Sequence, residues 1–131
     1  MAIKILLAED DLQLVDMYSR KFELEGFEVQ VAEDGQKALD ILDTGFEPDI
    51  AILDVMMPQV DGLQVLRKIK EDDRFKNLIV IMLTNLSDDN TAEQIYTLGA
   101  TEYIVKAEMT PLEVANKVKE LVTIYKKDKV K

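Results

Sequence analysis

The sequence predicts an α/β protein in which a doubly wound parallel sheet carries helices on both faces. Short apolar runs of strand length alternate along the chain with amphipathic stretches of helical spacing, five of each. Short connections between such elements favour right-handed crossovers and parallel strands. The run from Ile50 to Leu53 is apolar throughout and ends at Asp54, which is typical of a strand buried on both faces. We take this run as the centre of the sheet.

The first half of the chain supplies three strands and two helices. The strands are expected at residues 3–8, 28–32 and 50–53, the second with the polar–apolar alternation of an edge strand. The apolar face of the first helix is formed by Leu14, Met17, Tyr18, Phe22 and Leu24. Gly26 is a favourable left-handed stop for that helix. A shorter helix is expected between Gly35 and Gly45.

The second half supplies three helices and two strands. Asp61 is the expected N-cap of the third helix, whose inward residues are Leu63, Leu66 and Ile69. The strands are expected at residues 78–83 and 101–105. Capping boxes open the last two helices at Asn90 and Thr110, and Gly99 ends the former. The apolar face of the last helix is formed by Leu112, Val114, Val118, Leu121, Val122 and Tyr125.

Composition limits the classes of function. The 131 residues are 47% hydrophobic, which is normal for one globular domain, and include no cysteine and no histidine. Disulfides and thiolate metal sites are therefore excluded, and a zinc site or a histidine-based triad is nearly excluded. The net charge of −10 disfavours direct nucleic-acid contact. With no signal peptide and no membrane-spanning run, we expect a cytoplasmic protein with a domain at 1–125 and a polar tail at 126–131.

Acidic residues follow the first and third predicted strands. Glu9 and Asp10 come after the first strand, and Asp54 ends the third. Parallel strands bring their carboxyl ends to one edge, where these carboxylates would repel one another unless something neutralises them. An all-oxygen site for a hard cation such as Mg²⁺ fits this set. Asp10 or Asp11 alone is read more simply as the cap of the first helix, and for Asp11 we favour that role.

Thr84 and Lys106 end the fourth and fifth strands. A hydroxyl donor and an ammonium that face a metal-bound carboxylate are suited to hold the non-bridging oxygens of a phosphoryl group. Taken singly, Thr84 is better explained as a strand-end residue and Lys106 as a solvated surface charge. Their arrival at the same edge as the carboxylates favours the functional interpretation.

The motifs at the strand ends carry a family resemblance. They are Leu6-Leu7-Ala8-Glu9-Asp10-Asp11, Leu53-Asp54-Val55-Met56-Met57-Pro58, Asp61-Gly62, Met82-Leu83-Thr84-Asn85, Gly99-Ala100 and Tyr103-Ile104-Val105-Lys106. In this order the chain resembles the bacterial two-component response-regulator receiver domain, of the stand-alone, chemotaxis-regulator kind, over nearly its whole length. The resemblance implies a flavodoxin-like sheet with strand order 2-1-3-4-5.

The resemblance also implies a phosphorelay switch that is not an enzyme beyond its own phosphorylation and dephosphorylation. Asp54 would accept a phosphoryl group from a phosphohistidine of a sensor histidine kinase or phosphotransfer protein. Asp10, Asp54 and the backbone carbonyl of Met56 would bind Mg²⁺, and Glu9 would act mainly through water.

In the family, a hydroxyl and a lysine at these positions contact the phosphoryl group. Thr84 would therefore hydrogen-bond the group and Lys106 would pair with it. Phosphorylation would be coupled to a shift of the fourth strand, fourth helix and fifth strand in which Tyr103 turns inward. The simpler interpretation of Tyr103 is a half-exposed strand aromatic. Signalling would run through protein–protein contact with a downstream target, by a face that includes Ile95, Tyr96 and Tyr103, from a monomer or weak dimer.

Three departures from the family pattern affect the site. Ala107 follows Lys106 where the family usually has a proline joined by a cis bond, so we expect a trans bond or a strained cis bond. Asn85 replaces a very small residue and is expected to narrow the entrance to Asp54. Apolar Met56 and Leu86 predict slow autodephosphorylation, which a phospho-form that decays within seconds would contradict.

Three alternatives remain open from the sequence. A phosphatase of the aspartyl-phosphate type would need a second acid where Met56 stands. A flavin-binding flavodoxin would need a phosphate-binding loop where Glu9, Asp10 and Asp11 stand. A degenerate receiver would act as a phosphorylation-independent interaction module, an interpretation that Asn85 and Ala107 keep open.

Overall fold

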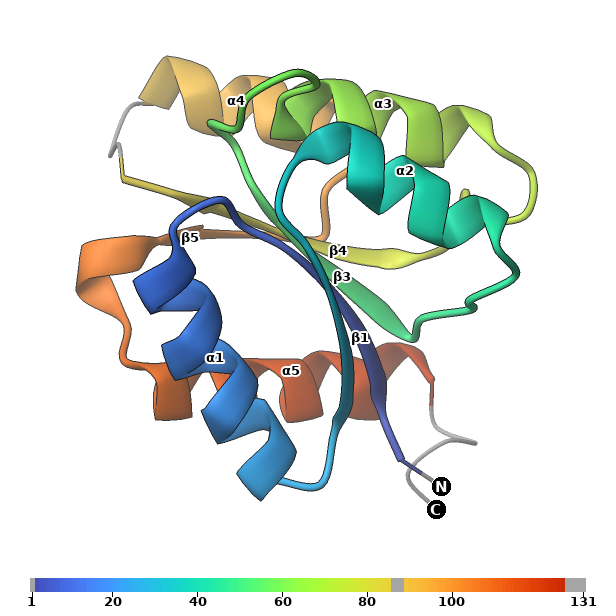
Figure 1. Cartoon of the computed structure of the whole chain (residues 1–131). Helices are drawn as coiled ribbons and strands as arrows, with labels where there is room; N and C mark the ends of the chain where they lie inside the picture. The colour runs from blue at the N-terminus through green and yellow to red at the C-terminus, as the bar shows by residue number, and fades with distance from the viewer. Residues whose placement is uncertain (1, 86–88, 127–131) are drawn as a thin grey trace.

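The computed structural model describes residues 2–85 and 89–126 and contains the alternating elements that the sequence predicts (Figure 1). The strands are β1 (Lys4–Ala8), β2 (Glu28–Ala32), β3 (Ile50–Asp54), β4 (Ile79–Thr84) and β5 (Glu102–Val105). The helices are α1 (Leu12–Leu24), α2 (Gly35–Asp43), α3 (Gly62–Glu71), α4 (Asp89–Thr97) and α5 (Pro111–Tyr125), with a 3₁₀ turn, η1 (Lys106–Glu108), before the last. Several strand bounds differ by one residue from those expected, which is the usual uncertainty at strand ends.

All five strands form a single parallel sheet in the order β2-β1-β3-β4-β5. This confirms the doubly wound, flavodoxin-like fold with order 2-1-3-4-5. Helices α2, α3 and α4 cover one face, and α1 and α5 cover the other (Figure 1). Because β1 leads to a helix on one face and β3 to a helix on the opposite face, a crevice forms outside the carboxyl ends of these two strands.

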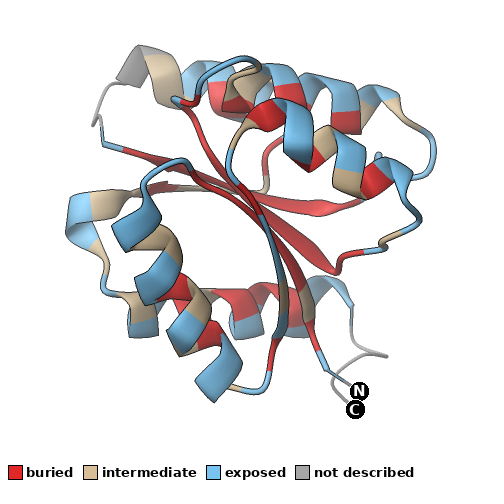
Figure 2. Cartoon of the chain, viewed as in Figure 1, coloured by how far each residue is buried: buried red, intermediate tan, exposed pale blue. Residues whose placement is uncertain are grey.

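Successive residues of the inner strands enter two separate cores. Leu6 and Ala51 pack under α2, α3 and α4, whereas Ile5 and Ile50 pack against α1 and α5. The inner strands are therefore buried on both sides, as Figure 2 shows for β3 and β4. The first core also receives Ala38, Leu42, Val65, Leu66, Ile69 and Ile95, and the second receives Tyr18, Phe22, Val114, Val118, Leu121 and Val122.

Side-chain caps fix where the helices begin. The carboxylate of Asp11 accepts from the backbone N–H groups of Gln13 and Leu14, so Asp11 is the cap of α1 as expected. Capping boxes at Asp61 and Thr110 open α3 and α5. Helix α4 begins at Asp89, and the side chain of Asn90, where a cap was expected, lies outside what the structure describes.

Four residues assigned to apolar faces are exposed instead. Leu24 and Tyr125 are the last residues of α1 and α5, and Leu112 lies in the first turn of α5, where the helices extend past their packing partners. Met17 lies one position around the helix from the Tyr18 stripe that faces the sheet. Ile95, assigned to an interaction face, is completely buried.

Among the described residues, no helix has both the length and the apolarity that crossing a bilayer requires.

Gly62 brings α3 into direct contact with the end of the central strand. A Cβ atom at Gly62 would overlap the backbone carbonyl oxygen of Asp54. The Gly62 N–H also donates to the Val55 carbonyl at 2.9 Å. The close approach of α3 to the strand end that carries Asp54 therefore requires glycine at this position.

We expect Gly62→Ala to destabilise the fold by about 2–3 kcal/mol, because the added methyl group must displace either α3 or the end of β3. Urea unfolding followed by circular dichroism measures the change. Lys68→Ala, at an exposed position of the same helix, is the matched control and should shift stability by less than about 0.5 kcal/mol. Equal stability of the two variants would contradict this account of the α3 contact.

Candidate functional site

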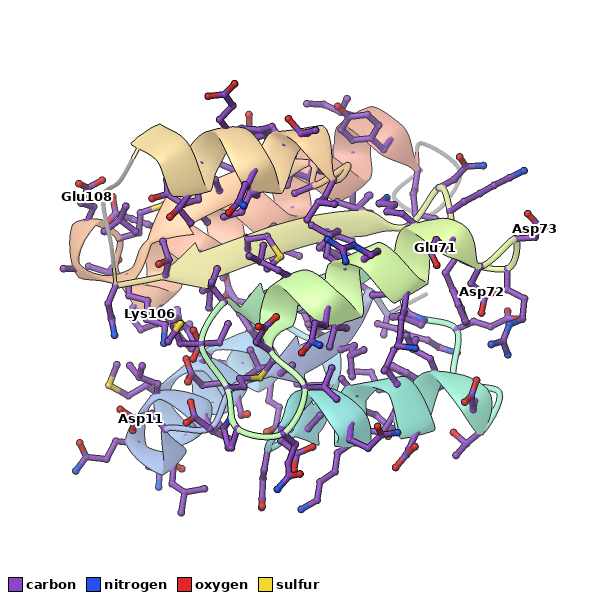
Figure 3. The ribbon with its side chains drawn as sticks, turned by 90° about the horizontal axis from the view of Figure 1, so that it is seen from above. Asp11, Glu71, Asp72, Asp73, Lys106 and Glu108 are labelled. Carbon is purple, nitrogen blue, oxygen red and sulfur yellow. The ribbon has the colours of Figure 1, made fainter. Side chains whose placement is uncertain are left out.

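The candidate site lies at the carboxyl ends of four neighbouring strands. Glu9 and Asp10 follow β1, Asp54 ends β3, Thr84 ends β4, and Lys106 follows β5. These side chains line one cavity of about 320 Å³, together with Asp11, Leu14, Met56 and Asn85. Figure 3 shows Asp11 and Lys106 at the same end of the molecule. The structure thus brings together the candidate residues that the sequence placed at different strand ends.

Three carboxylates meet in this cavity with different exposure. Glu9 is completely buried, Asp54 is 4% exposed and Asp10 is exposed. Each offers one oxygen atom such that the three atoms lie within 4.8 Å of one another. Burying two carboxylates so close together is unfavourable unless cations or hydrogen bonds compensate them.

The ammonium of Lys106 supplies part of that compensation. Its Nζ lies 2.7 Å from Oε1 of Glu9 and 3.1 Å from Oδ2 of Asp54. The Lys106 side chain is itself only 8% exposed. Burial alone would lower the pKa of the Lys106 ammonium, but the two carboxylates outweigh burial and raise the pKa. Lys106 therefore remains charged, and it bridges the two buried acids.

Backbone N–H groups hold the remaining oxygen of each buried acid. The Met56 N–H donates to Oδ1 of Asp54 at 3.2 Å, and the Asp11 N–H donates to Oε2 of Glu9 at 3.1 Å. Both donors belong to the loops that leave the strands. The carboxylates are therefore oriented by the main chain as well as by Lys106.

Lys106 does not fully offset the negative charge. Burial, followed by the hydrogen bond and charge of Glu9, raises the pKa of Asp54 to about 7, with Lys106 acting in the opposite direction. A carboxyl group with such a pKa holds its proton more firmly than an ordinary aspartate, because ionising it adds a second buried negative charge.

The donor set fits a hard divalent cation. Three carboxylate oxygens converge with one ammonium nearby, so the site has excess negative charge, and one acid, Asp10, is open to solvent. Mg²⁺ prefers oxygen ligands and retains several waters, which a cavity open to solvent accommodates. Glu9, Asp10 and Asp54 are the residues that would hold it, with the Met56 backbone in the adjoining loop.

The other residues singled out from the sequence have the following positions. Thr84 is buried at the end of β4, and Asn85 lines the cavity beside it. The described residues contain no cis peptide bond, so the Lys106–Ala107 bond is trans, and it opens the 3₁₀ turn η1. Leu86 lies outside the described residues.

Tyr103 lies on β5 next to a tyrosine of α4. Its ring is half-buried and meets the ring of Tyr96 edge-on, with the centroids 6.5 Å apart. Tyr96 is 48% exposed. The pair thus connects α4 to β5 at the surface, while Tyr103 also packs against the core under α2, α3 and α4.

One aromatic near the site was assigned only to the core from sequence. Tyr18 of α1 is buried, and burial raises the pKa of its phenol, with Lys106 opposing and Glu9 and Asp54 reinforcing the change. Its electrostatic coupling to three site residues had no sequence signal, because helical spacing alone indicates only an inward-facing residue. Tyr18 therefore stays neutral.

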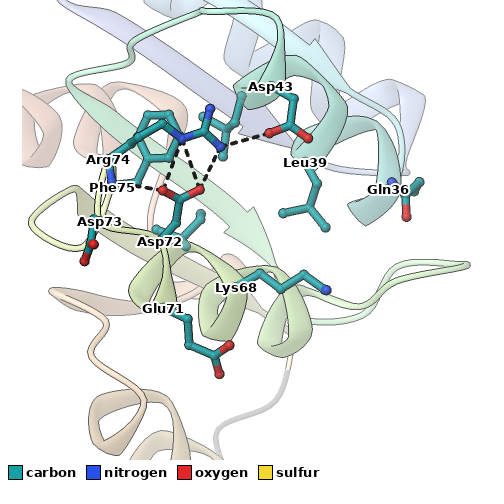
Figure 4. Close-up of a pocket in the computed structure, with 11 residues that line it drawn as sticks. Gln36, Leu39, Asp43, Lys68, Glu71, Asp72, Asp73, Arg74 and Phe75 are labelled. Carbon is teal, nitrogen blue, oxygen red and sulfur yellow. Dashed lines mark hydrogen bonds and ion pairs between the residues drawn. The ribbon is translucent and has the colours of Figure 1, made fainter.

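A larger cavity, of about 680 Å³, lies between α2 and the end of α3 and contains none of the candidate residues (Figure 4). Three of its charged groups pair with one another. Arg74 contacts Asp72 at 2.7 Å and Asp43 at 2.9 Å, and its guanidinium lies over the ring of Phe75. Glu71, Asp72 and Asp73 lie at the end of the molecule opposite Lys106 (Figure 3).

Comparison with protein families identifies one match that covers most of the chain. Residues 5–119 match the family model described as the response regulator receiver domain. Among solved structures, a CheY-like response regulator receiver domain protein from Methanospirillum hungatei superimposes with a TM-score of 0.88 and 25% identity, over 98% of this chain and 99% of that one.

Two curated relatives are similar over 103 residues, or 79% of this chain. They are the transcriptional regulatory protein CpxR of Escherichia coli, at 39% identity, and the DNA-binding dual master transcriptional regulator RpaA of Synechocystis, at 36% identity. The match covers 42% of each of these relatives, so the chain corresponds to less than half of their length.

We expect Asp54→Asn to stabilise the protein in chelator at pH 8 by on the order of 1–3 kcal/mol. The pKa of Asp54 is raised by folding, so the folded state binds more protons than the unfolded state between about pH 4 and pH 7. The wild type therefore loses stability as the pH rises through this window, whereas the asparagine variant does not.

Urea unfolding at several pH values measures this difference, with Asp40→Asn on the exposed side of α2 as the control. The advantage of Asp54→Asn should shrink as the pH falls below about 7. An advantage of the same size at pH 4 and pH 8, or none at pH 8, would show that Asp54 ionises normally.

Proposed function

Since the chain belongs to the response regulator receiver domain family, we propose that it is a Mg²⁺-dependent phosphoacceptor switch whose acceptor is Asp54. The observation that carries this proposal is the position of Asp54 in an acidic cavity beside the Lys106 ammonium, which lies 3.1 Å away. A nucleophilic carboxylate, a cation-binding acid pair and a fixed ammonium are the components that phosphoryl transfer to a carboxylate needs.

The transfer step uses a phosphohistidine as donor. One carboxylate oxygen of Asp54 forms a bond to phosphorus while the bond from phosphorus to the donor imidazole nitrogen breaks. The electron pair of that bond leaves with the imidazole, whose other nitrogen carries a proton so that the ring departs neutral, and the ionised Asp54 becomes an acyl phosphate. These 131 residues contain no histidine, so the donor lies outside them, and we infer that it belongs to a sensor histidine kinase or a phosphotransfer protein.

Mg²⁺, when bound, neutralises charge on the phosphoryl oxygens and lowers the pKa of Asp54. The chain's own residues do the rest. Glu9 and Asp10 orient the cation site, and the Met56 N–H donates to Asp54 and keeps its carboxylate turned toward the cavity. Lys106 would exchange its contact with Asp54 for a phosphoryl oxygen, and the Thr84 hydroxyl would donate to another.

The acyl phosphate would change the contacts at the ends of β4 and β5. Movement of Thr84 toward a phosphoryl group would vacate space beside β4, and Tyr103 of β5 would turn into it and away from Tyr96. The edge-on contact between the two rings is the part of the surface that such a turn would alter. We propose that a downstream protein reads this change.

The partner class follows from charge. The net charge of −10 opposes approach to a phosphate backbone, so we propose that this domain signals by protein contact. CpxR is named as a transcriptional regulatory protein and RpaA as a DNA-binding transcriptional regulator. Each of these proteins is more than twice as long as the region that matches this chain. Those names describe the two relatives. For the present chain we propose a downstream protein partner and a monomeric or weakly dimeric state. Slow autodephosphorylation also stays a prediction.

The test is phosphorylation by a small-molecule phosphodonor, followed by intact mass spectrometry. We expect one added phosphoryl group on the wild type in the presence of Mg²⁺ and none after chelation. Asp54→Asn should gain none. Asp40→Asn makes the same substitution at an exposed position of α2 and should behave as the wild type.

Modification of Asp54→Asn to the same extent as the wild type would place the acceptor elsewhere. A folded wild type that gains no phosphoryl group would refute the switch and favour the degenerate receiver, which acts without phosphorylation.

A further inference from the structure

The loop from β3 to α3, residues 55–61, carries the Met56 backbone beside the acid cluster. Its base is closed by two hydrogen bonds of 2.9 Å, from Val55 N–H to the Leu83 carbonyl and from Gly62 N–H to the Val55 carbonyl. These bonds fix where the loop leaves and rejoins the fold. They do not involve residues 56–61 of the loop.

Val60, near the end of the loop, packs against the start of α2. A Cβ atom at Gly35, the first residue of α2, would overlap the backbone carbonyl oxygen of Val60 and crowd its carbonyl carbon. The backbone of Gly35 therefore packs directly on the Val60 peptide. The first turn of a helix carries partial positive charge from its free N–H groups, so the Val60 carbonyl oxygen meets a favourable field there.

The loop also has backbone strain that its surroundings must maintain. Gln59 has φ of 68°, in the left-handed region that non-glycine residues seldom adopt. Such a conformation costs on the order of 1–3 kcal/mol and persists only where neighbouring contacts determine it. On one side of Gln59, Met57 is buried, and on the other side Val60 contacts Gly35.

The same two-residue unit begins both helices that border this loop. Asp34 and Asp61 cap α2 and α3 through the N–H groups of Lys37 and Gln64, and a glycine follows each cap. Gly62 packs against Asp54, as described above, and Gly35 packs against Val60. The two Asp-Gly units therefore hold the loop from both ends.

We propose that Gly35 is a positioning residue for the cation site: it fixes the Val60 backbone and, through the short loop, the position of the Met56 carbonyl. The inference rests on the proposed function, because it requires that Mg²⁺ binds beside this loop. Gly35 touches neither the acids nor the phosphoryl group. Its part is to hold the loop at the distance from Asp54 that the cation requires.

Isothermal titration with Mg²⁺, on metal-free protein at pH 8, tests the proposal. We expect Gly35→Ala to raise the Mg²⁺ dissociation constant about tenfold, as loss of an outer support does at metal sites. Gln36→Ala, at the next and exposed position of α2, should leave the constant unchanged. Circular dichroism establishes that each variant is folded and measures its melting temperature. A merely structural role for Gly35 would lower the melting temperature and leave the Mg²⁺ affinity of the folded protein intact.

A folded Gly35→Ala variant with wild-type Mg²⁺ affinity overturns the proposal. If that variant does not fold, insertion of one glycine between Gln59 and Val60 lengthens the segment that links Met56 to the Val60 contact without adding an atom to α2. We expect the insertion to weaken Mg²⁺ binding, and unchanged affinity overturns the proposal equally. A wild type that binds no Mg²⁺ refutes the proposed function itself, and this inference with it.

Discussion

The ammonium of Lys106 lies between two buried carboxylates, and the rest of the site depends on that contact. Glu9 and Asp54 are both almost free of solvent, and each places an oxygen within 3.1 Å of the lysine nitrogen. Removal of the lysine from such a group would leave the buried acids uncompensated, which is costly. The single ammonium does not balance the acids, so the site favours a proton on Asp54 or a cation beside it.

Sheet topology makes this contact form. The order β2-β1-β3-β4-β5 sets β3 between β1 and β4, so that residues far apart in sequence reach one edge. Lys106 crosses from the end of β5 to acids that follow β1 and end β3. The chain passes from β5 into the 3₁₀ turn at Lys106, and the bond from Lys106 to Ala107 is trans. The position of the ammonium is thus a property of the whole fold.

Alternating apolar patterns and helix caps were sufficient to predict the elements, their order along the chain and the edge at which Asp54, Thr84 and Lys106 meet. The pattern did not predict the ion pair between Lys106 and Glu9, since it depends on the reach of a flexible side chain across two strands. Nor did it show that Gly35 contacts Val60, because a glycine at a helix start is explained equally well by local conformation. Exposure of Leu112 was missed because periodicity does not show where a helix outruns its partner.

The most direct test of this account is the titration of the Asp54 carboxyl group by NMR, with Asp54→Asn used to assign the signal. In chelator, the account predicts a midpoint near pH 7, set by burial and by Glu9. Saturating Mg²⁺ should move the midpoint to lower pH, because a bound cation favours the ionised carboxylate. An ordinary midpoint near pH 4 in chelator, unchanged by Mg²⁺, would contradict the central claim that two buried acids share one lysine and await a cation.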